Sequence, residues 1–440
     1  MTEDLLLKEH PQRRQFVSEM HLRRWPEICA PTEIIQILRL VSEQDRKLEQ
    51  SAIRDLPTGG RPDDSDNSKH VSGKLPDGIE FTVEFHTEAN LVSLFAPMPA
   101  GQEANFFGSR GAASEALSWA ARLPGEVLRA TRITVAENEA DAENLVERFN
   151  FRPDDLVSCR VGSGARVWSD FRIGDDAFGR LVIAANGVSC HELSRLVQRL
   201  QELGNYRNLA LLGLPAAHQN WPTLTQLEQQ LVSLASDVSK SDITDDHLLE
   251  RVSELSMELM QVSTGTSYRM SATAAYAHLV EERLSDLDVV PIPGFLSLED
   301  FTQRRFRPAV RTCAAHTSRE AELSLRAERF ASLLRTRIET RIENQNARLL
   351  LSMEKSATLQ LRLQQLVEGL SVVALSYYVV GLLSYATKGI KAVSSNSNYE
   401  LILSLSTILV VFGVWRILHA AKKALLETPN KTHQTRQKRR

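Results

Sequence analysis

The hydrophobic pattern of the chain changes character near residue 215. Before it, residues 79–85 alternate strictly between apolar and polar side chains, which predicts a half-buried strand, and short apolar runs interleave with helical segments. Such interleaving is typical of an α+β or α/β domain, so we predict one over residues 1–215. Within it, residues 33–48 carry apolar side chains at helical spacing and predict a helix. Residues 56–78 are rich in Gly, Pro, Asp and Ser and predict a mobile surface loop.

Beyond residue 215 the apolar positions follow the spacing of long helices. Leucines and valines recur at steps of three and four along residues 224–238 and again along residues 248–262, as in the seam of a coiled coil. The polar residues between these two runs predict a turn, and so an antiparallel hairpin. No strong helix breaker interrupts residues 311–387. We therefore predict a helical coiled-coil stalk over residues 216–368, which continues into the apolar stretch after it.

Two apolar segments near the C-terminus predict a transmembrane hairpin. Residues 369–387 carry no charged side chain, and ~20 apolar residues are enough to cross a hydrocarbon layer ~30 Å thick. Residues 401–419 form the second predicted span, and residues 388–400 form a polar external loop between the two. Cations gather in the tail, residues 420–440. The positive-inside rule then places the tail, and with it the N-terminal domain, on the cytoplasmic side of the inner membrane.

Several residues of the spans and the tail predict contacts in or on the bilayer. Small and hydroxyl-bearing residues on one side of each span favour close packing of membrane helices, or else line a pore. These residues are Tyr377, Gly381, Ser384, Tyr385, Ser406 and Gly413. The basic side chains of the tail either set the topology alone or also contact anionic lipid head groups. They include Lys422, Lys423, Arg436, Lys438, Arg439 and Arg440.

Composition narrows the classes of partner. A chain of 440 residues with 42% apolar and 24% charged residues can bury a large core, and its net charge of −3 gives no case for a nucleic-acid partner. The four cysteines contain no close pair, so we predict neither a zinc site nor a disulfide framework. Cys29, Cys159, Cys190 and Cys313 are expected to be ordinary reduced core residues of a cytoplasmic domain.

Two groups of polar residues are candidates for a site. Glu84, His86 and Glu88 stand at two-residue spacing, so they either bind a divalent metal from one face of a strand or form its ordinary solvent face. The second candidate group consists of Arg195, Arg199 and Arg207, which share a helix. They either form salt bridges with acidic neighbours or contact an anionic ligand or partner. No other cofactor is predicted. The sequence has no Gly-x-Ser-x-Gly, Walker A or His-Glu-x-x-His motif, so we assign no catalytic residue.

Several blocks of the sequence carry a resemblance to a known family. They are "LLRTRIETRIENQNARLLLSM" and "LQLRLQQLVEGLSVVALSYYVVGLL" within residues 333–383, "RLVQRLQELGNYRNLALLGLP" at 195–215 and "WSDFR" at 168–172. In these blocks the chain resembles the bacterial membrane-anchored proteins catalogued as domain-of-unknown-function family 3422. The resemblance implies a membrane-anchored protein and carries no activity. The order of the predicted domains is also similar to that of CorA-type divalent-cation channels, although residues 384–389 replace the Gly-Met-Asn motif of those channels.

The sequence thus predicts a multi-pass protein of the inner membrane with both termini in the cytoplasm. We expect it to act as an interaction or scaffold module that forms homo-oligomers through the stalk and the membrane helices. Two alternatives stay open at this point. One is an oligomeric two-span ion channel or transporter of CorA-like plan, and the other is a membrane-anchored, metal-dependent enzyme.

Overall fold

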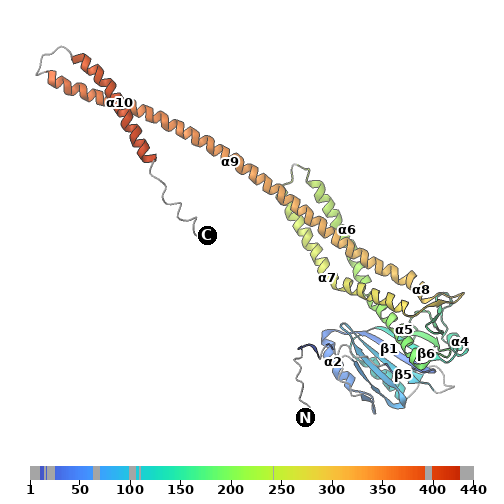
Figure 1. The fold of residues 1–440 in the computed structure, drawn as a ribbon. Coiled ribbons are helices and arrows are strands. Elements are labelled where there is room, and N and C mark those ends of the chain that lie inside the picture. The colour runs from blue at the N-terminus through green and yellow to red at the C-terminus, as the bar shows by residue number, and fades with distance from the viewer. Residues whose placement is uncertain are drawn as a thin grey trace, which may run out of the picture. The chain divides into compact units, whose positions relative to one another are not determined.

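The computed structural model describes residues 10–13, 16, 25–62, 70–98, 106–108, 111–240, 242–391 and 399–426. The chain divides into two compact units, Met1–Leu333 and Leu334–Arg440. The first unit contains a sheet and the helices around it, and the second contains most of a long helix and the helix that follows (Figure 1). The predicted boundary at residue 215 falls inside a helix of the first unit.

The described part of the first unit is built on one ten-stranded sheet. Its strands lie in the order β10-β7-β8-β9-β6-β1-β5-β4-β3-β2 and pair antiparallel, except for β6 and β9, which are parallel. The strands are β1 Thr32–Leu40, β2 Arg61–Pro62, β3 His70–Lys74, β4 Glu80–Phe85, β5 Ala89–Pro97, β6 Glu126–Ala136, β7 Val157–Val161, β8 Ala165–Ser169, β9 Gly179–Ala184 and β10 Val290–Pro291. The prediction of a mixed α+β domain is confirmed, and β4 matches the strand predicted from alternation.

Strand β1 replaces the first half of the helix predicted over residues 33–48, so that part of the prediction is wrong. The strand lies between β5 and β6, and eight of its nine residues are buried. Ile34 packs into the apolar core on one face of the sheet, and Ile35 packs into the core on the other. A strand that is covered on both faces shows a continuous apolar run, which periodicity alone does not separate from a helix. The helix α2 begins only at Glu43 and ends at Arg54.

The predicted surface loop of residues 56–78 also contains sheet structure. Strands β2 and β3 pair with each other, β3 pairs with β4, and a short 3-10 turn, Pro76–Gly78, follows. Residues 63–69 lie outside the described part. A Cβ at Gly73 would lie 2.3 Å from the carbonyl oxygen of Arg61, so glycine is needed where these two strands approach. Strands at the edge of a sheet are often polar, so the polar composition of residues 56–78 does not distinguish edge strands from a loop.

Helices cover both faces of the sheet. One face carries α2 and α3, Ala112–Arg122, and residues of both helices pack into the same core cluster; α4, Glu139–Arg148, packs with Trp168 in a further cluster. The other face carries α5, Cys190–Leu211, whose leucines pack against strands and against α7. In Figure 1, α5 lies beside β6, and the sheet extends from it toward α2.

A disulfide joins Cys29, just before β1, to Cys190, the first residue of α5. The Cα atoms are 4.6 Å apart although the residues are separated by 161 positions in the sequence. The prediction that no cysteines pair was therefore wrong, because proximity across the fold cannot be read from sequence spacing. Cys159 and Cys313 are buried free thiols, as predicted for core residues.

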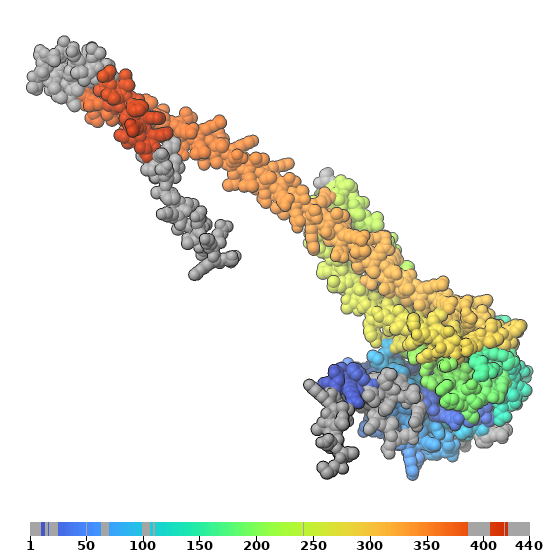
Figure 2. Space-filling model, in the orientation of Figure 1, coloured from blue at the N-terminus to red at the C-terminus, as the bar shows by residue number. Residues whose placement is uncertain are grey.

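The helices after α5 form a hairpin and then a long helix. Helices α6, Gly213–Asp237, and α7, Asp245–Ser285, bury the predicted seams, with Leu227 and Leu231 on one helix and Leu255 and Leu259 on the other. A short helix α8, Leu298–Phe301, and a π-helical turn η4, Thr302–Phe306, lead into α9, Arg307–Lys391. Within the first unit, ion pairs join α9 to both hairpin helices, and Figure 2 shows their surfaces in contact.

The second unit contains the rest of α9 and α10, Tyr399–Leu426. In the described part of the chain, one helical stretch, Leu298–Tyr385, contains a segment long and apolar enough to cross a membrane, and 6% of that segment is buried. The apolar part of α10 with described side chains, Leu405–Ile417, is shorter than a span. The second predicted span is therefore not established by the fold.

Candidate functional site

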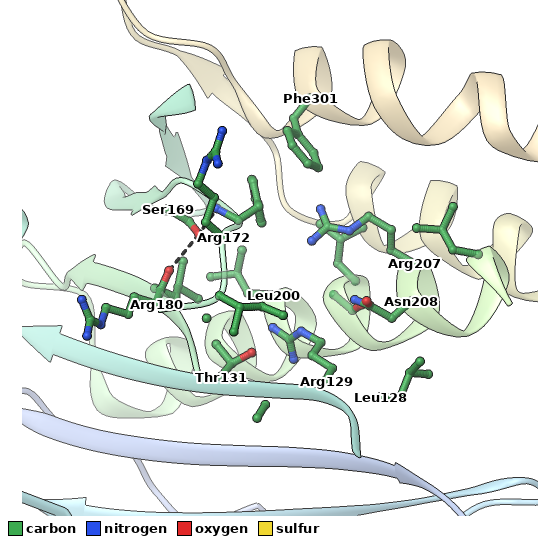
Figure 3. Close-up of a pocket in the computed structure, with 18 of the residues that line it drawn as sticks. Leu128, Arg129, Thr131, Ser169, Arg172, Arg180, Leu200, Arg207, Asn208 and Phe301 are labelled. Atoms are coloured by element: carbon green, nitrogen blue, oxygen red, sulfur yellow. Dashed lines mark hydrogen bonds between the residues drawn. The ribbon is translucent and has the colours of Figure 1, made fainter. Parts of the chain in front are cut away.

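The first unit contains a cavity of about 530 Å³ between α5, the first residues of β6, the connection from β8 to β9, and the segment α8–η4 (Figure 3). Cavities that bind small molecules are typically ~300–1,000 Å³. Apolar side chains form much of the wall, including Leu200, Leu203, Leu211, Leu298, Phe301 and Phe306. Five arginines complete it: Arg129, Arg172, Arg180, Arg207 and Arg305. None of the described residues that line this cavity is acidic.

Helix α5 supplies one wall because its lining residues recur at helical spacing. Leu200, Leu203, Arg207 and Leu211 are separated by three or four residues and so lie on one side of the helix. The helix begins where Ser189 caps it, with the serine side chain accepting a hydrogen bond from the Glu192 N–H. Residues on the other side of α5 pack against the sheet, and this packing fixes the position of the helix.

Arg129 enters the cavity from β6 and is held by neutral side chains. Its Nη1 donates to Oε1 of Gln36 at 3.1 Å, to Oε1 of Gln201 at 2.8 Å and to Oδ1 of Asn205 at 2.9 Å. A Cβ at Gly204 would lie 2.7 Å from Nη2 of Arg129, so the glycine gives the guanidinium room along α5. Burial, and after it the charge of Arg207, lower the pKa of Arg129 to about 9.

Arg207 lies against two aromatic rings. Its guanidinium carbon is 4.4 Å from the ring centroid of Phe171 and 4.9 Å from that of Phe301. The two ring centroids are 4.2 Å apart. Contacts of this kind stabilise a cation and fix its plane. Burial lowers the pKa of Arg207 to about 10.

Two unusual backbone segments bring these rings to the cavity. Phe171 has a φ of 52°, a left-handed conformation that is rare for an aromatic residue, and its N–H donates to Ser169 Oγ at 3.1 Å. Phe301 ends α8, which starts with a capping box formed by Ser297 and Asp300. The π-helical turn η4 follows directly and places Arg305 on the rim. Strained backbone and π-helical turns both concentrate at functional sites.

Two of the other arginines, Arg172 and Arg180, have acidic partners outside the cavity lining. Arg172 donates from Nε to Asp155 Oδ2 at 2.9 Å, and the Arg172 guanidinium lowers the pKa of the Asp155 carboxyl. Arg180 lies 3.6 Å from Asp176 through Nη2 and Oδ2. Their charges are thus largely compensated. The contacts of Arg129 and Arg207 described above are instead neutral amides and aromatic rings.

A sequence model of one protein family matches residues 8–425, and its description is "protein of unknown function", family DUF3422. The chain belongs to the DUF3422 family. The resemblance noted in the sequence is therefore confirmed, and the match includes both the cavity and helix α9. No curated protein and no solved structure matches the chain.

The DUF3422 fold keeps two of the three predicted metal ligands together, with His86 Nε2 3.9 Å from Glu84 Oε2, and pairs the third, Glu88, elsewhere. Strand β4 ends at Phe85, and the chain turns, with the His86 N–H donating to the Ala89 carbonyl at 2.9 Å. Glu84 accepts from the Trp25 indole, and Glu88 pairs with Arg269 at 2.9 Å. The prediction that all three share one strand face is wrong because the strand is too short. Within the described residues, no group of three His, Cys, Asp or Glu is placed to hold a metal ion.

The three predicted arginines of α5 also have different surroundings. Arg195 and Arg199 are exposed, and Nη1 of Arg199 donates to the Asp286 carbonyl at 2.9 Å. Arg207 alone lines the cavity. The sequence reasoning missed Arg129 and its other neighbours because they come from separate segments. A usable signal was that "WSDFR" and "RLVQRLQELGNYRNLALLGLP", two blocks of the family resemblance, both contribute lining residues.

The residues predicted to pack the membrane helices together, or to line a pore, lie in the second unit. Tyr377 and Tyr385 are both 77% exposed, and a Cβ at Gly381 or Gly413 would meet nothing within 4 Å. Ser384 and Ser406 are half-buried. The described structure of one chain therefore contains no close helix packing at either glycine. Of the basic tail, the side chains of Lys422 and Lys423 and the residues Arg436, Lys438, Arg439 and Arg440 lie outside the described part.

Proposed function

We propose that this DUF3422 protein is a membrane-attached interaction or scaffold module that helix α9 anchors in the bilayer. The observation that carries the proposal is the apolar segment of α9, of which 6% is buried. The core helix of a soluble protein would bury such a segment, whereas lipid accommodates it in the exposed state. The family resemblance implies the same attachment.

The finer topology is part of the proposal. Residues 369–387 and 401–419 form two spans joined by the external loop 388–400, and both termini are cytoplasmic. The basic tail supports this orientation. The disulfide between Cys29 and Cys190 favours the opposite one, because stable disulfides are typical of oxidising compartments. Labelling from one side of the membrane decides between the two orientations.

We further propose that the protein self-associates through the second-unit part of α9. Leu359, Leu363, Leu366 and Leu370 repeat at steps of four, three and four, and they are 59–75% exposed. A helix side with this spacing is buried when a second helix packs along it. A second copy of the chain supplies such a helix, and Gly381 and Gly413 leave room for close approach within the bilayer.

Membrane attachment is tested with a charged variant of the span. Leu375→Arg combined with Leu382→Arg places two cations in the apolar segment, and each costs ~3 kcal/mol at the centre of a membrane helix. The wild type is expected to stay in membranes after an alkaline carbonate wash, and the double variant is expected to be released. Leu333→Arg is the matched control, since Leu333 is 65% exposed on the same helix outside the predicted span. Release of the wild type by carbonate refutes the proposal.

Orientation and assembly need two further measurements. A membrane-impermeant maleimide applied from outside intact cells should label Ser395→Cys in the predicted external loop and not a cysteine placed in the first unit. Labelling of the first unit instead reverses the orientation. The mass of the detergent-solubilised protein gives the oligomer number. A monomer contradicts self-association, and a monomer or dimer excludes a channel of CorA-like plan, because two spans per chain do not wall a pore in so few copies.

A further inference from the structure

We infer that the arginine-lined cavity binds an amphiphilic organic anion: a carboxylate or phosphate group carried by a compact apolar body. The inference does not depend on membrane attachment. It concerns the cavity formed by α5, β6, the β8–β9 connection and α8–η4, which lies wholly within the first unit.

The size and the wall fit the apolar part of such a ligand. About 530 Å³ accommodates a bicyclic aromatic ring or a medium-length alkyl chain together with its head group. The apolar lining of the cavity includes Leu200, Leu203 and Leu211 from α5, and Leu298 and Phe306 from the segment α8–η4. Binding of an apolar ligand against such a wall is favourable because the ligand displaces water from the apolar surface. An inorganic ion would leave most of this apolar surface in contact with water.

The charge of the lining fits the head group. Arg129 and Arg207 bring two positive charges close enough that Arg207 lowers the pKa of Arg129. Their described contacts are amide oxygens and aromatic rings, so the like charges are not neutralised from within the lining. Protein interiors rarely keep cations without a paired anion, because the desolvation cost is high. A bound oxyanion would supply the missing negative charge.

The geometry presents both guanidinium groups to the same space. In Figure 3, Arg129 extends from the strand below the cavity and Arg207 from α5, with Phe301 on the far side of Arg207. The rings of Phe171 and Phe301 fix the plane of the Arg207 guanidinium, and the three amide oxygens fix Arg129. Planar, fixed guanidinium groups bind carboxylate and phosphate through paired hydrogen bonds. Arg172 and Arg180 are already compensated and act as the outer rim.

The test is calorimetric titration of the full-length protein in lipid nanodiscs, with empty nanodiscs as the blank. The probes are naphthalene-2-carboxylate, 2-naphthyl phosphate, and the neutral isostere naphthalene-2-carboxamide. At least one anion is expected to bind about tenfold or more tightly than the carboxamide, as a charge-assisted hydrogen bond implies. The stronger of the two anions identifies the head group. Binding of neither anion at millimolar concentration, or equal binding of all three probes, overturns the inference.

Variants locate the site. Arg207→Met keeps the length of the side chain and removes its charge, so it is expected to weaken binding of the anion about tenfold or more and to leave the carboxamide unaffected. Arg195→Met is the matched control, because Arg195 is exposed on the same helix outside the cavity lining. Asn208→Leu, which fills the lining without removing charge, tests the volume and should weaken both classes of probe. Unchanged anion affinity in Arg207→Met, with the thermal unfolding temperature equal to that of the wild type, refutes the assignment.

Discussion

The disulfide between Cys29 and Cys190 predicts a large contribution to stability. It closes a loop across 161 residues and ties the segment before β1 to the first residue of α5. In the loop-closure account, a cross-link of this span lowers the conformational entropy of the unfolded chain by the equivalent of about 5 kcal/mol. Cys29→Ser, Cys190→Ser and the double variant are each expected to lose about this much free energy of unfolding. The three losses should be equal, because either substitution removes the same bond.

Urea unfolding of the full-length protein in detergent, followed by tryptophan fluorescence, measures this loss. Trp25 reports on the linked segment, since its indole donates to Glu84 Oε1 at 3.0 Å and packs at 5.3 Å from the Phe95 ring. Reductant should shift the wild-type midpoint to that of the double variant and leave the double variant unchanged. Cys313→Ser is the control for loss of a buried thiol, and its effect should not depend on reductant.

Counting thiols gives an independent check on the same bond. Alkylation under denaturing conditions without reductant should modify two of the four cysteines, Cys159 and Cys313, and all four after reduction. Four modified cysteines before reduction, or an unfolding midpoint that reductant does not move, would show that the bond does not form and that the entropic argument fails. The outcome also bears on orientation, because a persistent bond is typical of an oxidising compartment.

Four further substitutions have effects whose sign the structure fixes, each measurable by urea or thermal unfolding. Burial raises the pKa of Glu49 from 4.5 to about 7, so the free energy of unfolding of the wild type falls as pH rises from 4.5 toward 7. Glu49→Gln cannot ionise and should therefore be more stable than the wild type by up to about 3 kcal/mol at pH 8, and by little at pH 4. Burial lowers the pKa of His316, so stability falls with falling pH below its usual 6.5, and His316→Leu should remove that loss. Gly213→Ala would place a Cβ 2.3 Å from Thr273 Oγ1 and should cost about 1–3 kcal/mol, whereas Gly265→Ala, with an open surrounding, should gain about 0.5–1 kcal/mol.

Periodicity predicted the elements that have one buried face and failed where both faces are buried. The buried leucines and valines of α6 and α7 recur along one side of each helix, so their three-and-four spacing was readable in the sequence. Strand β1 is covered on both sides, and its polar residues are paired inside the fold. Glu33 Oε1 accepts from Arg132 at 2.6 Å, and Arg39 Nη2 donates to the Ala120 carbonyl at 2.6 Å. These polar positions interrupt the apolar run without marking a solvent face, which made the strand resemble an amphipathic helix.

The cavity could not be assembled from the sequence because its charges come from segments that only the sheet brings together. Arg129 is on β6, Arg172 lies in the connection between β8 and β9, and Arg180 lies in β9. Arg305 follows more than a hundred residues later. Each is an ordinary surface arginine by its local pattern. Arg207 was identified as a candidate for contact with an anion, but it was grouped by helix spacing with Arg195 and Arg199, which lie outside the cavity lining. Spacing along one helix therefore identified one of the residues that line a cavity built from several elements.

The cavity and helix α9 share a boundary in the chain. Phe306 lines the cavity, and the next residue, Arg307, begins α9, which continues as one helix to Lys391. The turn between them is π-helical, and returning from such a turn to α-helical hydrogen bonding changes the rotation at which the following helix starts. A ligand that contacts Phe301 or Arg305 would therefore contact the segment that sets the start of α9. The proposed anion site and the proposed anchor are therefore connected through one short segment of the chain, η4, with no flexible linker between η4 and α9.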